Sequence, residues 1–220
     1  MEYAFHVLNK FATDGVALAL DEVLKNDLSQ KLLPKALRDK TENRQTNAEI
    51  KAFQKAFNGD FNKQPVVVCV GSDLAIGDSL GPITGSMLKY KTQGLGVYIY
   101  GTLSAPITAK EIKYLRTFLK ETHAGSQIIA IDAAVGAEGD IGLLKILDYP
   151  LSPGAGANKK LGTIGDISIM GIVAEKSVAN YGLFNTTRLN LVYSMSEIIS
   201  NALAQVFWNK QKPLDKANRV

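Results

Sequence analysis

The sequence has few of the residues that build disulfides and metal sites, with one cysteine and two histidines among 220 residues. Cys69 has no partner for an internal disulfide, which favours a reduced intracellular setting. His6 and His123 are far apart in the chain and neither lies in a ligand-like cluster, so we expect no zinc site, and no metal or other cofactor. No histidine lies near Cys69 in the sequence and no Gly-x-Ser-x-Gly motif is present, which argues against a cysteine or serine nucleophile.

The sequence also lacks a long apolar run, since no segment approaches the ~20 residues that a membrane helix needs. The N-terminus carries Glu2 and lacks the basic and apolar regions of a signal peptide. Hydrophobic residues make up 46% and charged residues 21%, which excludes a disordered chain, a fibre and a low-complexity repeat. We therefore expect a cytoplasmic globular protein that does not associate with membranes.

The net charge of +4 is concentrated at the C-terminus. Residues 209–220 contain four basic residues and one acidic residue, whereas residues 1–60 contain nine of each kind. Residues 61–208 contain twelve basic and eleven acidic residues, so the body of the protein is close to neutral. A basic tail on a neutral body is typical of a solvated terminus, and we expect no nucleic-acid partner.

The chain divides by pattern into three parts. Residues 1–60 predict a helical segment and a linker, because apolar residues recur at helical spacing over 18–32 and again over 50–57. This segment is expected to be a packing layer, a pro-segment over a cleft, or a partner-binding helix. Residues 61–208 predict one α/β domain, and residues 209–220 form the basic tail.

The α/β domain is predicted from short apolar strands that alternate with helical patterns. The run from Pro65 to Val70 is continuously apolar, as expected for a strand buried on both faces of a parallel sheet. Two βα units that lead into a third strand predict a three-layer, doubly wound, mostly parallel sheet with an N-terminal helical extension. The predicted strands are 65–70, 96–101, 127–131, 141–147 and 166–173, and the predicted helices of this part are 81–89, 110–122 and 185–208. In the last helix, Leu189, Val192, Met195, Ile199, Leu203 and Val206 are spaced to face inward.

Two aspartates are expected where ligands bind in such sheets, beyond the carboxyl ends of the strands at the point where strand order reverses. Asp78 lies in the loop after the first strand of the domain, and Asp132 directly follows its third strand, so they meet if these strands are neighbours. A close carboxylate pair can hold one proton and activate water with the other, ionised group. Alternatively, Asp78 is a helix cap and Asp132 a polar strand end. Asp73 lies in the same loop as Asp78 and competes for its role.

A glycine-rich segment at 153–160 offers backbone amides and positive charge. Gly154, Gly156, Asn158 and Lys159 are candidates for binding a substrate or an oxyanion, and a surface loop is the alternative. The segment is not a phosphate-binding Walker loop, and the loop at 71–77 lacks the dinucleotide Gly-x-Gly-x-x-Gly pattern. We therefore expect no nucleotide site.

Five motifs occur in one order over residues 65–208: Asp-Ser-Leu-Gly-Pro at 78–82, Gly-Thr-Leu at 101–103, Ile-Ala-Ile-Asp-Ala at 129–133, Pro-Gly-Ala-Gly-Ala-Asn-Lys at 153–159 and Gly-Asp-Ile-Ser-Ile-Met-Gly at 165–171. Together they resemble the YyaC-type sporulation proteins of endospore-forming bacteria. That family in turn resembles the germination protease, which degrades small acid-soluble spore proteins. The wider fold group of these proteins, which has a phosphorylase/hydrolase-like fold, also contains the hydrogenase maturation endopeptidases. The resemblance thus implies an endopeptidase fold.

The resemblance also implies an intracellular, metal-independent endopeptidase of sporulation or germination that acts by an atypical aspartic mechanism. Asp78 and Asp132 match the aspartates implicated in the germination protease. Asp132 is expected to be the ionised base and Asp78 its protonated partner, but the sequence leaves open which of the two holds the proton, because such a pair titrates as a unit. Small acid-soluble spore proteins or other peptides are the implied substrates, and the forespore or spore interior the implied location. Ser152 replaces a histidine of the germination protease, and the nickel-recognition histidine of the maturation enzymes has no counterpart. A catalytically silent protein that binds a peptide or partner, or a metal-recognising maturation endopeptidase, therefore stays an alternative, and either a monomer or an oligomer is compatible.

Overall fold

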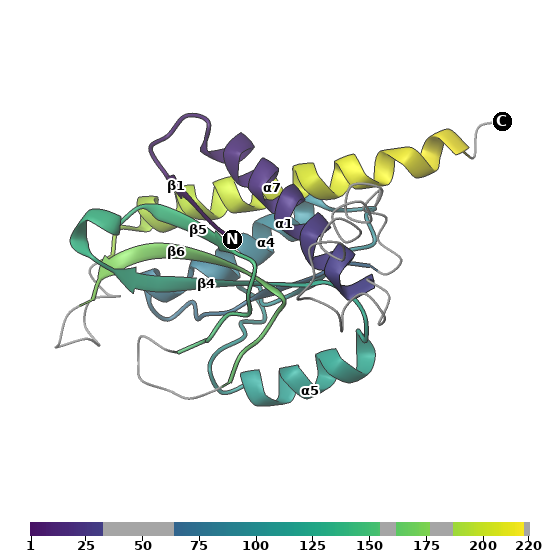
Figure 1. Ribbon diagram of the computed structural model, residues 1–220. Helices are drawn as coiled ribbons and strands as arrows, with labels where there is room; N and C mark the ends of the chain where they lie inside the picture. Colours follow the sequence, from purple (N-terminus) through teal and green to yellow (C-terminus); the bar gives the residue numbers. More distant parts are fainter. Residues whose placement is uncertain (33–63, 155–161, 177–186, 218–220) are drawn as a thin grey trace, which may run out of the picture.

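The computed structural model describes residues 1–32, 64–154, 162–176 and 187–217. They form a six-stranded sheet in the order β1-β5-β6-β4-β2-β3, with helices on both of its faces (Figure 1). The predicted three-layer α/β class is therefore confirmed. The helical pattern at 50–57 lies outside the described residues. None of the helices within the described ranges is both long and apolar enough to cross a membrane.

Four neighbouring strands of the sheet are parallel. They are β2 (Val66–Cys69), β3 (Tyr98–Tyr100), β4 (Ile128–Gly136) and β6 (Ile167–Glu175). All four residues of β2 are buried, because this strand has neighbours on both sides and helices on both faces. The continuous apolar run of the sequence thus identified a central strand correctly. β2 lies between β3 and β4, so the neighbours expected from the common doubly wound order are the neighbours found.

The other edge of the sheet is antiparallel. β5 (Leu143–Leu147) pairs with β6, and β1 (Glu2–His6) pairs with β5 over its whole length. The sequence analysis did not predict β1. Its Tyr3 and Phe5 alternate with more exposed residues and pack against the main core, a period-two signal that was present in the sequence. The N-terminal ammonium also pairs with Asp148 at 2.5 Å, which holds the start of β1 against the end of β5.

Among the described residues, three helices cover one face of the sheet and one helix covers the other, an arrangement that can be followed in Figure 1. α1 (Ala12–Leu32), α4 (Leu80–Lys91) and α7 (Leu189–Ala217) share the larger core, and α5 (Ile112–Thr122) covers the smaller one. Residues 12–24 of α1 bury apolar side chains against this sheet, so at least this stretch of the N-terminal part is a packing layer. Leu189 was expected to face inward but is 54% exposed, because it begins α7 beyond the edge of the core. The other five predicted positions of α7 are buried, namely Val192, Met195, Ile199, Leu203 and Val206.

Candidate active site

The candidate site lies at the point where the strand order reverses. From β2 the chain crosses to β3 on one side, and it returns through α5 to β4 on the other side of β2. The loops that follow β2 and β4 therefore diverge and leave a crevice between them. β2 and β4 pair from Val66 with Ile128 to Cys69 with Ile131, and the Val70 amide donates to the Ile131 carbonyl at 2.7 Å. The next residue on β4 is Asp132.

The sequence predicted Asp132 at the end of its strand, but the structure places it inside β4. β4 continues to Gly136 because β6 goes on pairing with it, with an irregularity between Ala134 and Val135. Ile131 is the last β4 residue that is hydrogen-bonded to β2 and to Val70, which continues it, and Asp132 is the next residue. Ile128 and Ala130 face the α5 side of the sheet, and strand alternation places Asp132 on this same side.

Asp78 reaches the crevice from the loop that follows β2. It is the last residue of the short helix η1 (Ile76–Asp78), directly before Ser79, the N-cap residue of α4. The alternative role of Asp78 as the helix cap therefore falls to its neighbour Ser79. The Ser72 amide donates to the Asp78 carbonyl at 3.0 Å, so the loop folds back on itself. Gly71 permits this turn, since its φ is 138° and a Cβ there would lie 2.1 Å from the Asp78 carbonyl oxygen.

The start of α4 is held against the end of β2. A Cβ at Gly81 would lie 2.0 Å from the Val70 carbonyl oxygen, so only glycine lets the helix approach the strand this closely. The amino end of a 12-residue helix consequently lies beside the loop that carries Asp78. The partial positive charge of that helix end favours a negative charge nearby.

The structure brings Asp78 and Asp132 into electrostatic contact. Asp132 is only 9% exposed, and burial raises the pKa of its carboxyl group well above the usual range. The negative charge of Asp78 raises this pKa further, while the Ala133 amide, which donates to Asp132 Oδ1 at 2.8 Å, lowers it. The sequence-based expectation placed the proton on Asp78. These directions favour Asp132 as the protonated member, because a deeply buried carboxylate loses the most hydration when it is charged.

The other predicted site residues are more scattered. Asp73 is exposed in the loop before η1. Gly154 is half-buried in a turn with a φ of 74°, a conformation that favours glycine. Gly156, Asn158 and Lys159 lie outside the described residues. On either side of these residues in the sequence, Leu151 and Ile164 form a β-bridge, and their buried side chains pack on the α5 side.

Alternative catalytic groups are engaged elsewhere. The ring of His123 is hydrogen-bonded to the Tyr100 hydroxyl at 2.7 Å, and that of His6 to the Ile141 carbonyl at 3.3 Å. Cys69 is fully buried, and burial raises the pKa of its thiol, which disfavours the reactive thiolate. No cluster of three potential metal ligands occurs in the part of the chain that the structure describes.

The loop that carries Asp78 exposes apolar side chains that were not among the predicted site residues. Leu74 is 92% exposed and Ile76 is 38% exposed, both within five residues of that aspartate. Leu103, at 44% exposure, follows β3 at the same edge of the sheet. The signal for the first two was an apolar pair in an otherwise small and polar loop. Leu74 and Ile76 thus offer exposed apolar surface on the loop that carries Asp78.

Fold and site together define a class: a doubly wound α/β protein with a buried carboxyl group, Asp132, and a half-buried one, Asp78, at its topological switch point. The chain belongs to the family whose model is described as "Protein of unknown function (DUF1256)", which matches residues 39–202. It is 40% identical over 142 residues to "Uncharacterized protein YyaC" of Bacillus subtilis (strain 168), which covers 64% of this chain and 69% of that protein. The predicted resemblance to YyaC-type proteins is thereby confirmed. The resemblance was expected to begin at residue 65, whereas the family match already begins at residue 39.

Among solved structures, the chain is similar to the [NiFe] hydrogenase maturation protease HycI from Thermococcus kodakarensis KOD1. The sequence identity is 18% and the TM-score 0.46, over 70% of this chain and 97% of that protein.

Proposed function

We propose that this chain is an endopeptidase in which Asp78 and Asp132 act together on a water molecule and a peptide carbonyl. The observation that carries the proposal is the burial of Asp132 beside Asp78 at the switch point, which favours one shared proton over two negative charges. A pair with one proton contains both an acid and a base at the same pH, as peptide hydrolysis by carboxylates requires. The two groups titrate as a unit.

In the proposed reaction, protonated Asp132 donates to the oxygen of the scissile carbonyl and ionised Asp78 accepts a proton from water. The water oxygen then bonds to the carbonyl carbon, and the Asp132 proton passes to the former carbonyl oxygen. On collapse the carbon–nitrogen bond breaks, and the leaving nitrogen takes the proton held by Asp78. A hydroxyl proton of the intermediate returns to Asp132, which restores the pair. The amino end of α4 stabilises the ionised state of Asp78.

The exposed side chains of Leu74 and Ile76 supply apolar surface for the residues that flank the scissile bond. The motif resemblance supports a role in sporulation or germination, with small acid-soluble spore proteins as the first substrates to test. The glycine-rich segment at 153–159 is the proposed source of amides for the oxyanion.

The test is cleavage of small acid-soluble spore proteins and of a mixed peptide library, followed by mass spectrometry from mildly acidic to neutral pH. Asp132→Asn and Asp78→Asn are each expected to lower turnover by about 10³-fold or more, since each removes one partner of the proton transfer. Glu138→Gln is the matched control, because Glu138 is an exposed carboxylate that follows the same strand. Wild-type turnover in either aspartate variant contradicts the proposal. Absence of cleavage by well-folded wild type on every substrate favours the catalytically silent, partner-binding alternative, and stoichiometric nickel binding favours a maturation-type enzyme.

A further inference from the structure

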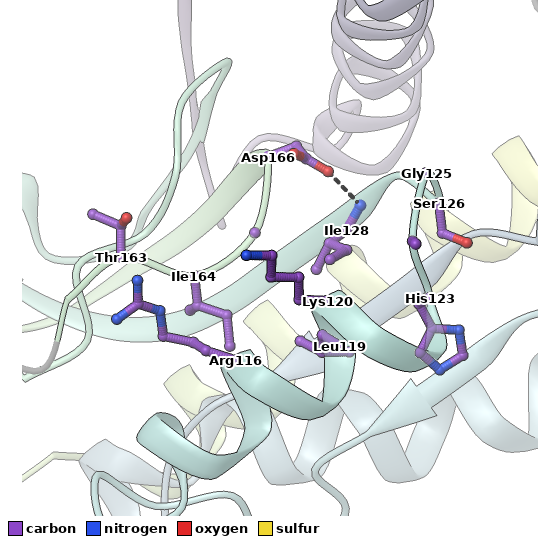
Figure 2. A pocket seen from close by; sticks show the side chains of 12 residues that line it. Arg116, Leu119, Lys120, His123, Gly125, Ser126, Ile128, Thr163, Ile164 and Asp166 are labelled. Atoms are coloured by element: carbon purple, nitrogen blue, oxygen red, sulfur yellow. Dashed lines mark hydrogen bonds between the residues drawn. The ribbon is translucent and has the colours of Figure 1, made fainter.

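A cavity of about 520 Å³ lies at the amino end of β4, away from the aspartate pair. Figure 2 shows the residues that line it. The cavity opens between α5 and the segment 163–166 that leads into β6. Ile128 lines it, and Asp132 is four residues further along the same strand, or ~13 Å away at the usual rise per residue. The cavity is thus separate from the proposed active site.

The cavity combines an apolar floor with a basic rim. Leu119 and Ile164, each less than 5% exposed, form part of the floor. Arg116 and Lys120 lie one turn apart on α5 and reach toward the segment 163–166 (Figure 2). Neither cation has an ion pair or side-chain hydrogen bond within the described residues.

The cavity lining contains one carboxylate beside its two cations. Asp166 is the one carboxylate among the lining residues, and its Oδ2 accepts the Ile128 amide at 2.8 Å, as the dashed line in Figure 2 marks. One carboxylate cannot balance both Arg116 and Lys120, so the rim keeps a net positive charge. Two cations over an apolar floor complement a ligand that carries both acidic and apolar groups.

Arg116 is exposed, and its guanidinium group lies against the backbone of Gly162. A Cβ at Gly162, the residue before Thr163 of the cavity lining, would lie 2.2 Å from Arg116 Nη1. A planar guanidinium in this position offers its donors to a carboxylate as a fork.

We propose that this cavity binds a peptide segment in which an apolar side chain is flanked by acidic ones. The apolar side chain occupies the floor at Leu119 and Ile164, and the acidic groups pair with Arg116 and Lys120. The inference does not rest on the proposed peptidase activity, because the two sites share no residue.

The test is fluorescence anisotropy with the full chain and a labelled hexapeptide that has one leucine flanked by three acidic residues. Binding by wild type is expected to weaken at least about tenfold in the double variant Arg116→Gln/Lys120→Gln and to weaken with added salt. The matched double variant Lys10→Gln/Lys89→Gln removes the same charge from exposed positions elsewhere and is expected to bind as wild type does. A second peptide, with asparagine and glutamine in place of the acidic residues, is expected to bind at least about tenfold more weakly.

Thermal melts of both double variants check that each is folded, and exposed substitutions of this kind leave the melting temperature nearly unchanged. The proposal is overturned if the acidic peptide does not bind at millimolar concentration. It is equally overturned if both double variants lose affinity alike, which indicates general charge attraction, or if the neutral peptide binds as well as the acidic one.

Discussion

The charge of Asp78, which lies between β2 and α4, acts on the buried carboxyl of Asp132 inside the neighbouring strand β4. Gly71 and Gly81 make this approach possible, because each lets the backbone around the β2 end pack more closely than a side chain would allow. The electrostatic coupling is thus a consequence of how α4 and its preceding loop are packed on β2.

Asp132 is expected to make the protein less stable as pH rises. Its pKa is raised in the folded state by burial and by Asp78, so the folded protein binds a proton that the unfolded chain releases near the ordinary aspartate pKa. The stabilising contribution is complete below the unfolded pKa and is lost as pH rises through the folded pKa. Thermal melts of wild type and Asp132→Asn between pH 4 and pH 9 measure this.

The Asp132→Asn variant is expected to gain stability relative to wild type toward high pH and to match it most closely at low pH, because asparagine carries no charge to bury. A stability difference that does not change with pH would show that Asp132 titrates alike in both states.

Gly81→Ala is expected to destabilise the fold by about 1–3 kcal/mol, since the added methyl group must displace α4 from the end of β2. Denaturant unfolding measures the change. Gly139→Ala is the control, because a Cβ there meets no atom within 4 Å, and surface changes of this kind alter stability by ~0.5 kcal/mol or less. Equal stability of the two variants would mean that the contact at Val70 is not tight in solution.

Phe5→Ala tests whether the N-terminal strand is part of the structural core. The Phe5 ring packs on α1, where a Cβ at Gly15 would lie 2.5 Å from its Cε1 atom. We expect a loss of about 2 kcal/mol, less than for a fully buried phenylalanine, because the side chain is half-buried. Leu18→Ala, at a position 73% exposed, is expected to change unfolding free energy by ~0.5 kcal/mol or less. Similar losses in both variants would argue against a packed β1.

Cys69 is expected to resist thiol reagents in the native protein. Its side chain is fully buried in β2, and burial raises the pKa of the thiol, so neither access nor thiolate is available. Colour development with an aromatic disulfide reagent should follow the rate of unfolding and become fast in denaturant. Rapid reaction in native buffer would indicate that the end of β2 opens readily.

The central sheet and its switch point were predictable because their signals are local. The apolar run at 65–70 reads as a strand with two buried faces, and parallel strands with helices between them leave few possible orders. β1 was missed because an edge strand alternates over only five residues and resembles a polar terminus. The position of the shared proton was open at the level of the sequence, because the depth of Asp132 depends on how far β6 extends along β4, which no local pattern reveals.

The shared proton is tested most directly by following the carboxyl ¹³C shifts of labelled aspartates with pH, in wild type and in Asp78→Asn. The account predicts that Asp132 titrates well above the ordinary aspartate range in wild type. Its pKa should fall in Asp78→Asn, because the neighbouring charge is removed, yet stay raised by burial. Titration of Asp132 in the ordinary range, or at the same pH in both proteins, would contradict the coupling on which the proposed mechanism depends.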